Sequence, residues 1–194
     1  GLFQIDAGVK SKRWPKPVGM SLESKTCALV GMGDIGREIA KRLLLSEMRV
    51  HVYDPAKPDL SGLSGAIQHR DWPDANDEAD FVVLCCSLNP ATNHLLDQNF
   101  FARCKPGLRV VNISRGPLID EVALATALRS GAVHSAALEV FDVEPLPPES
   151  PLRDFEQVVF GSHNGSNTQE AVDRTSHRAV ELLLEQLDRG TSPL

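Results

Sequence analysis

The chain has 194 residues, of which 42% are hydrophobic and 24% charged, so it can bury the core of a soluble globular domain. Its formal net charge of −6 argues against non-specific nucleic-acid binding, because such binding needs a basic surface. The sequence has no apolar run near the ~18 residues of a membrane-spanning helix, and no signal-peptide pattern at its start.

Residues 1–25 are polar and rich in lysine, proline and glycine. Trp14, Pro15 and Pro17 favour an extended lead-in segment over a core element. The chain begins at Gly1 instead of methionine, so we expect either a tag remnant or a piece of a longer protein.

The segment from Thr26 to Pro55 combines a strand, a glycine turn, a helix and a second strand. Residues 27–30 form a short apolar run typical of a buried parallel strand, and residues 31–36 fit the pattern G-x-G-x-x-G. Residues 49–53 alternate into the second strand, which Asp54 closes. The helix between the strands has an apolar face, expected to pack on the sheet, at Ile35, Ile39, Ala40, Leu43 and Leu44.

Each part of this pattern has a physical role in holding a dinucleotide. Gly31 permits a tight turn, Gly33 lets the backbone approach a pyrophosphate, and Gly36 lets the helix pack close to the strand. The helix N-terminus offers unpaired N–H groups to that pyrophosphate. Asp54 can accept hydrogen bonds from the adenosine ribose and would repel the extra phosphate of NADP, so NAD is the expected cofactor. The alternative is a glycine turn that binds another nucleotide or none.

Strands and helices continue to alternate along the rest of the chain. The remaining predicted strands span residues 66–69, 80–86, 109–112, 134–141 and 157–160. The remaining predicted helices span residues 71–79, 97–104, 120–130 and 168–189. With no hairpin signals, this alternation predicts an α/β fold with a doubly wound parallel sheet, in which one Rossmann dinucleotide-binding domain covers residues 26–190.

Two of these helices have an apolar face that predicts contact with the core. In the helix at 120–130 the apolar positions are Val122, Leu124, Ala125 and Leu128. In the helix at 168–189 the core-like face consists of Ala171, Val172, Ala179, Leu183 and Leu187.

Polar residues directly follow three of the predicted strands, and the carboxyl ends of strands are where open α/β sheets bind ligands. The three polar segments are residues 112–116, 142–145 and 161–166. Together they supply Arg115, Glu144 and His163.

This trio suits the reduction of a 2-keto acid. An arginine can hold the substrate carboxylate with two N–H donors, and a histidine can give a proton to the carbonyl oxygen as hydride arrives on carbon. A glutamate beside that histidine fixes its orientation. In the other interpretation, Arg115 is a capping or surface cation, Glu144 a solvated loop charge and His163 a structural histidine.

The four cysteines are Cys27, Cys85, Cys86 and Cys104, with no C-x-x-C spacing. Three of them lie in or beside apolar strands, so we interpret them as buried reduced thiols in a cytoplasmic protein and predict no metal site. A redox or metal role for the Cys85–Cys86 pair is the alternative.

These motifs resemble the D-isomer-specific 2-hydroxyacid dehydrogenases, a family that includes phosphoglycerate, glycerate (hydroxypyruvate), D-lactate and formate dehydrogenases. The resemblance runs from about Trp14 to Gly190. The turn GMGDIGREIA, the central stretch LCCSLNPATNHLLDQNFFARCKPGLRVVNISRGPLID and the closing stretches ALEVFDVEPLPPESPL and VVFGSHNGSNTQEA carry it.

The resemblance implies that Arg115 is the catalytic arginine, His163 the general acid/base and Glu144 its acidic partner. It also implies that NAD lies along the strand ends, with Glu139 at the nicotinamide carboxamide. The implied cofactor contacts are Gly31, Gly33, Asp34, Ile35, Gly36, Asp54, Cys86, Ile113, Ser114, Arg115, Glu139, His163, Gly165 and Ser166.

Several residues depart from the family pattern. Asp34 stands where the family usually has a non-acidic residue, and an acid beside a pyrophosphate should weaken binding unless it points to solvent. Glu139 stands where aspartate is usual, and its extra methylene is expected to shift the nicotinamide. Ser87, Ser162 and Asn164 replace the more common proline, proline and isoleucine.

The resemblance also implies a second, substrate-binding domain that this chain lacks. We therefore expect the chain to bind NAD but to turn over little 2-hydroxy or 2-keto acid alone, because nothing closes the cleft. A homodimer is implied by the resemblance only. Residues 145–152 favour a glycerate or hydroxypyruvate reductase and residues 166–171 a phosphoglycerate dehydrogenase. The alternatives from other classes are an NAD(H)-sensing scaffold protein without catalysis and a Rossmann-like methyltransferase.

Overall fold

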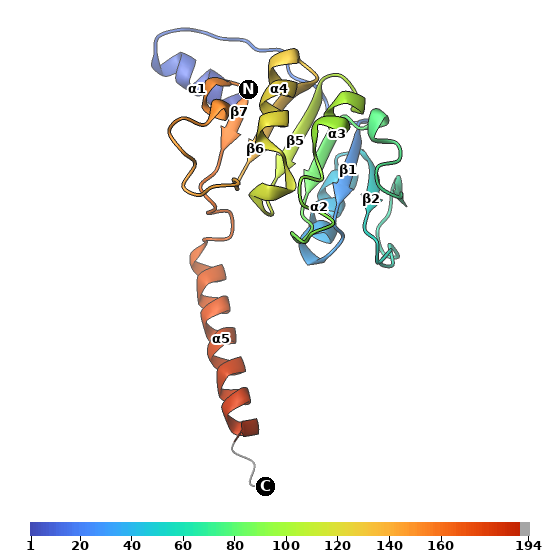
Figure 1. The fold of residues 1–194 in the computed structure, drawn as a ribbon, viewed down its shortest axis with the longest axis vertical. Coiled ribbons are helices and arrows are strands. Elements are labelled where there is room, and N and C mark those ends of the chain that lie inside the picture. The colour runs from blue at the N-terminus through green and yellow to red at the C-terminus, as the bar shows by residue number, and fades with distance from the viewer. Residues whose placement is uncertain (191–194) are drawn as a thin grey trace.

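The computed structural model describes residues 1–190, which form one parallel sheet with helices on both faces (Figure 1). The strands lie in the order β3-β2-β1-β4-β5-β6-β7, and each neighbouring pair is parallel. This arrangement confirms the predicted doubly wound α/β fold. The strands span Thr26–Val30 (β1), Arg49–Tyr53 (β2), Ile67–His69 (β3), Phe81–Leu84 (β4), Leu108–Asn112 (β5), Val133–Leu138 (β6) and Val158–Phe160 (β7).

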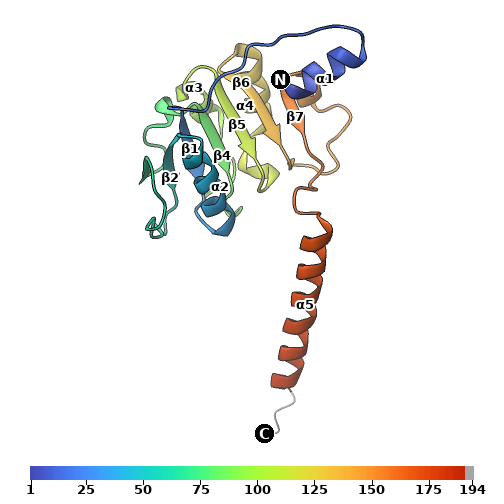
Figure 2. The ribbon, with the colours of Figure 1, turned by 180° about the vertical axis from the view of Figure 1, so that it is seen from behind.

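Helix α2 covers one face of the sheet, and α3 and α4 cover the other, as two opposite views show (Figure 1 and Figure 2). The helices span Leu2–Lys10 (α1), Asp34–Leu45 (α2), Gln98–Arg103 (α3), Glu121–Ser130 (α4) and Gln169–Gly190 (α5). Short 3₁₀ turns span Asn76–Glu78, Gly116–Leu118 and Pro151–Asp154.

Strand β1 lies at the centre of the core and is buried along its whole length. Ala28 and Val30 face the cluster beneath α3 and α4, whereas Cys27 and Leu29 face the cluster beneath α2. Because both faces of the strand are covered, its sequence is a continuous apolar run and not an alternation. This central strand holds the start of the glycine turn at a fixed position.

The order of the strands reverses at β1, since β2 and β3 lie on one side of it and β4 to β7 on the other. In open α/β sheets a crevice forms at such a point, outside the carboxyl ends of the strands. The loops after β1, β2 and β4 therefore surround one end of the sheet's crevice, and those after β5, β6 and β7 extend it.

Part of the lead-in segment differs from its prediction as an extended segment, because residues 2–10 form helix α1, whereas residues 13–22 have no regular secondary structure. An ion pair of 2.7 Å between Lys10 and Asp6 supports this helix. Gly8 is buried, and a Cβ there would lie 2.5 Å from the Cγ of Pro15. The proline-rich stretch folds back onto the helix, a contact that composition alone does not reveal.

The predicted helix at 71–79 is also wrong, since only Asn76–Glu78 form a 3₁₀ turn. Tertiary contacts hold this segment in another shape. The ring of Trp72 stacks on Phe100 at 5.4 Å, and the hydroxyl of Tyr53 donates to the carbonyl of Asp74 at 2.5 Å.

Two side chains that were predicted to face the core are exposed. Ile35, in the first turn of α2, is 61% exposed, whereas Ala40 in the same helix is buried. Val122, near the start of α4, is 72% exposed, while Leu124, Ala125 and Leu128 are buried as predicted.

Helix α5 projects away from the sheet, so its predicted core-like face is not buried within the described residues (Figure 1). Val172 is 44% exposed and Leu183 is 60% exposed. The apolar spacing identified an amphipathic helix correctly, but it does not show which surface covers the apolar side.

Replacing Gly36 by alanine should destabilise the domain. A Cβ at Gly36 would lie 2.3 Å from the carbonyl oxygen of Gly31, so the turn or the helix has to move, at a cost of about 1–3 kcal/mol. Thermal unfolding followed by circular dichroism measures this loss. Gly33→Ala is the matched control, because a Cβ there meets nothing within 4 Å. Equal losses of stability in the two variants would contradict the packing argument.

Candidate functional site

The parallel strands bring their following loops to one edge of the sheet, and those loops carry all the predicted site residues. In chain order, they are Gly31 to Gly36 in the turn after β1 and the first residues of α2, Asp54 after β2, Cys86 after β4, Ile113 to Arg115 after β5, Glu139 and Glu144 after β6, and His163 to Ser166 after β7. The edge therefore collects residues from distant parts of the sequence.

The glycine turn is braced by its neighbours on both sides. Gly31 has a φ of +96°, and a Cβ there would lie 2.7 Å from the backbone nitrogen of Cys86. On the other side, the Oδ2 of Asp54 accepts a hydrogen bond from the amide of Met32 at 2.8 Å. Only glycine meets both the backbone angle and the close contact at position 31.

The start of α2 has the space and polarity that a pyrophosphate requires. Nothing within 4 Å would meet a Cβ on Gly33, so this side of the turn is open. Helix α2 begins at Asp34, and the amides of a first helical turn have no partner within the helix. The side chain of Asp34 is exposed, so its charge is accessible to solvent.

A pocket of about 400 Å³ lies beside the turn, between the loops after β1, β2 and β4. Its lining includes Gly31, Asp54, Arg70, Trp72, Cys86 and Leu95. The Nε of Arg70 is buried and has no hydrogen-bond partner within residues 1–190, so a ligand with an acceptor can satisfy it. Pocket, turn and helix start together fit the adenosine end and pyrophosphate of a dinucleotide.

Arg70, Trp72 and Leu95 line the pocket although they were not predicted to do so from the sequence. Arg70 directly follows β3, so the rule that ligands gather at strand ends could have found it. Trp72 is placed by an edge contact with Tyr53, with ring centroids 5.3 Å apart, and Leu95 lies in a loop. No sequence motif marks either residue.

Asn112, at the end of β5, organises the loop that carries Arg115. It is fully buried, and its side chain donates to the carbonyl of Arg115 at 2.8 Å and accepts from the amide of Ser114 at 3.1 Å. The Ser114 hydroxyl donates to the carbonyl of Cys86. The backbone of this loop is thereby fixed, while the Arg115 side chain is exposed.

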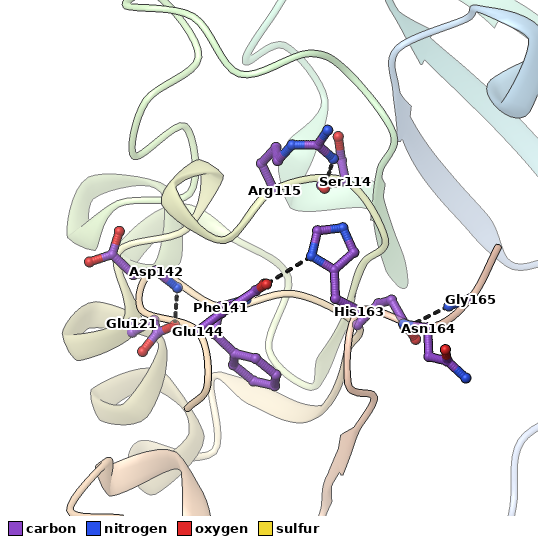
Figure 3. A network of polar contacts seen from close by, with 10 residues as sticks. Ser114, Arg115, Glu121, Phe141, Asp142, Glu144, His163, Asn164 and Gly165 are labelled. Carbon is purple, nitrogen blue, oxygen red and sulfur yellow. Dashed lines mark hydrogen bonds and ion pairs between the residues drawn. The ribbon is translucent and has the colours of Figure 1, made fainter. Parts of the chain in front are cut away.

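His163 and Glu144 form a direct pair (Figure 3). The Nδ1 of His163 lies 2.8 Å from the Oε2 of Glu144, and the Oε1 of Glu144 accepts from the amide of Phe141 at 2.9 Å. Because Nδ1 faces the carboxylate, Nε2 is the ring nitrogen left to meet a ligand.

The hydrogen bond from His163 holds the pKa of the Glu144 carboxyl below its ordinary value, and the Phe141 amide adds to this effect. The positive charge of Arg115 lowers the pKa of Glu144 further. The three residues predicted as a trio are thus brought together at one edge.

Glu139 is the first residue after β6, and its carboxylate accepts hydrogen bonds from the amides of Asn164 and Gly165. The carbonyl of Ser166 accepts from Thr168 at 3.0 Å, just before α5. The predicted contacts of Glu139, Gly165 and Ser166 with a nicotinamide stay predictions.

All four cysteines are free thiols, with Cys27 and Cys104 buried and the Cys85–Cys86 pair partly buried. Burial raises the pKa of Cys85 to about 12, and its thiol donates to the carbonyl of Gly31 at 3.1 Å. No His, Cys, Asp and Glu cluster within residues 1–190 is arranged to hold a metal ion. Over the same residues, every helix is too short or too polar to cross a membrane.

Comparison with known proteins identifies a family. Residues 1–165 match the model of the D-isomer specific 2-hydroxyacid dehydrogenase, NAD binding domain. The D-3-phosphoglycerate dehydrogenase of Homo sapiens is 40% identical over 177 residues, which are 88% of this chain and 32% of that protein. The hydroxypyruvate reductase of Thermotoga maritima is 37% identical over 190 residues, 96% of this chain and 61% of that protein.

Among solved structures, a glyoxylate reductase from Paecilomyes thermophila superposes with a TM-score of 0.88 at 28% identity, over 97% of this chain and 58% of that one. The chain thus spans about a third of the length of the phosphoglycerate dehydrogenases it matches, and about three-fifths of the reductases.

Replacing His163 by alanine should raise the pKa of the Glu144 carboxyl toward its ordinary value, because the hydrogen bond that lowers it most is lost. A pH titration of the side-chain carboxyl carbons by ¹³C NMR measures this shift. His177→Ala, an exposed position on α5, is the control and should leave Glu144 unchanged. An unchanged pKa of Glu144 in His163→Ala would show that the pair does not form in solution.

Proposed function

Because the chain belongs to the D-isomer-specific 2-hydroxyacid dehydrogenases as their NAD-binding domain, we propose that it forms the cofactor half of an enzyme acting on D-2-hydroxy acids and 2-keto acids. This proposal is supported above all by the 2.8 Å hydrogen bond between the Nδ1 of His163 and the Oε2 of Glu144. The pair lies near Arg115, on the sheet edge that also holds the glycine turn. A scaffold that only senses NAD(H) has no need of such a pair.

The residues of the first three loops suit the cofactor. The amides at Gly33, Asp34 and Ile35 would receive the pyrophosphate, and Asp54 would receive the ribose hydroxyls. The pocket beside Asp54 and Cys86 would hold the adenine. NAD supplies or accepts the hydride of the reaction.

Arg115 would bind the carboxylate of the substrate. Its Nη1 donates to the carbonyl of Ser114 at 2.6 Å, and a guanidinium has further N–H donors for a carboxylate. This contact fixes the carbonyl group to be reduced near His163. A fixed orientation of the reacting groups lowers the entropic part of the barrier.

His163 would transfer the proton at Nε2. It gives the proton to the carbonyl oxygen during reduction and removes it from the hydroxyl during oxidation. Glu144 holds the ring through Nδ1 and stabilises the positive imidazolium form. Since the pKa of Glu144 is lowered, the carboxylate is charged when the proton moves.

The rest of the substrate pocket would come from a second domain outside these 194 residues, because the chain spans only part of each relative. We also propose a homodimer. Its support is the resemblance together with exposed apolar side chains on α1, where Leu2 is 75% and Phe3 is 67% exposed. A cytoplasmic location stays a prediction.

The chain should bind NADH more tightly than NADPH by about tenfold or more, a difference of ~1.4 kcal/mol, because Asp54 repels the extra phosphate. Energy transfer from Trp72, which lines the pocket, to the reduced nicotinamide follows binding. Asp54→Ala should narrow the difference between the cofactors, whereas Gly33→Ala should weaken both alike. Equal affinities in the unaltered chain would contradict the role of Asp54.

In the full-length protein, His163→Ala should lower kcat for 2-keto-acid reduction by about 10²- to 10⁴-fold and leave NADH affinity in place, because only proton transfer is lost. His177→Ala is again the control. Near-normal turnover in His163→Ala would refute the assigned role. Tight NADH binding without turnover of any of several 2-keto acids by the unaltered protein would favour the scaffold alternative.

A further inference from the structure

The loop that carries His163 is hydrogen-bonded to Glu139. The Oε1 of Glu139 accepts hydrogen bonds from two successive amides of this loop, those of Asn164 and Gly165, the second at 2.8 Å. The backbone carbonyl of Glu139 accepts a third from the amide of His163 at 2.8 Å. One residue therefore receives the amides of three consecutive residues, beginning with the histidine itself.

The same loop is tight against Glu139 at its start. The amide of Gly161 donates to the carbonyl of Leu138 at 2.7 Å. A Cβ on Gly161 would lie 2.2 Å from the Oε2 of Glu139, so a side chain there would displace this carboxylate. The carboxylate thus fills the inside of the loop between Gly161 and Gly165.

His163 needs such support, because its φ is +56°, in the left-handed region that disfavours a residue with a side chain. The contacts with Glu139 hold the backbone on both sides of this strained residue. The backbone at His163 sets the direction of its imidazole ring. In this direction the Nδ1 of the ring lies 2.8 Å from the Oε2 of Glu144 (Figure 3).

We propose that Glu139 is a positioning residue, whose carboxylate fixes residues 161–165 so that the His163 ring faces Glu144. The inference rests on the proposed role of His163 in proton transfer. It assigns Glu139 to the loop, where the sequence resemblance assigned it to the nicotinamide. The extra methylene of glutamate over aspartate supplies the reach to both loop amides.

Two substitutions of Glu139 distinguish a role in positioning the His163 loop from a role in binding the nicotinamide. Glu139→Ala removes the acceptor for the Asn164 and Gly165 amides. Glu139→Gln keeps an oxygen at the same reach and removes only the charge. Glu149→Ala, an exposed charge in the loop after β6, is the matched control for a lost carboxylate.

The first readout uses this chain alone and needs no activity. Glu144 titrates under the influence of His163, the Phe141 amide and Arg115, and of these His163 has the largest effect. In Glu139→Ala the pKa of Glu144 should rise as it does in His163→Ala, and in Glu139→Gln it should return toward the value of the unaltered chain. An unchanged pKa of Glu144 in Glu139→Ala would overturn the proposal.

The second readout is the kinetics of the full-length protein. Glu139→Ala should lower kcat at least tenfold with less than a threefold change in the Kd for NADH, and Glu139→Gln should recover most of the loss. If Glu139→Ala weakens NADH binding instead and leaves the pKa of Glu144 unchanged, the residue binds the nicotinamide and the proposal fails.

The two proposals fail in different ways. If His163→Ala is inactive and Glu139→Ala raises the pKa of Glu144 but keeps full kcat, the positioning role is refuted and the proposed function stands. If His163→Ala retains turnover, the proposed function is refuted. The NMR titration then still decides whether Glu139 fixes the loop.

Discussion

The close contact between the glycine turn and the neighbouring strand ends is the constraint on which the cofactor half of the site depends. Gly31 lies against the backbone of Cys86, and Gly36 lies against the carbonyl of Gly31. These contacts leave no room for a side chain, so they draw β1, β4 and α2 together at one point. Asp54 completes the contact from β2 through the amide of Met32. The acid expected to bind a ribose therefore also holds the turn that faces the pyrophosphate.

The other half of the site depends on side chains at the strand ends that bind the backbone of the loops, and one of them, Asn112, is buried. Asn112 has no access to solvent, and it satisfies its side chain with the backbone that leads to Arg115. Glu139 and Glu144 both lie in the loop after β6; one oxygen of Glu139 accepts two backbone amides, and one oxygen of Glu144 accepts the amide of Phe141. Arg115 and His163, the residues proposed to act on the substrate, lie on exposed loops whose backbones hydrogen bonds hold at the sheet edge. This explains how side chains as accessible as Arg115 and His163 can keep a defined geometry.

Local patterns were sufficient to predict the sheet, the glycine turn and the position of Arg115, Glu144 and His163 at one sheet edge, while their catalytic roles stay a proposal. The turn motif and the polar residues at strand ends can be recognised in short segments. Because the strands are parallel, the residues that follow each strand all lie at the same edge of the sheet. Prediction failed where distant contacts decide the structure. Trp72 packs on Phe100 within the segment 71–79, which forms only a short 3₁₀ turn, and Pro15 packs on Gly8 of the unexpected helix α1. The apolar side of α5 was recognised, but within the described residues its side chains are exposed, so the expected burial against the core was wrong there.

A crystal structure of this chain with bound NAD⁺ would test the central claim most directly. The account predicts the pyrophosphate on the amides of residues 33–35, the adenosine in the pocket beside Asp54 and Arg70, and the nicotinamide next to His163. A dinucleotide bound elsewhere on the sheet would contradict the account. So would one with its nicotinamide end pointing away from the His163–Glu144 pair.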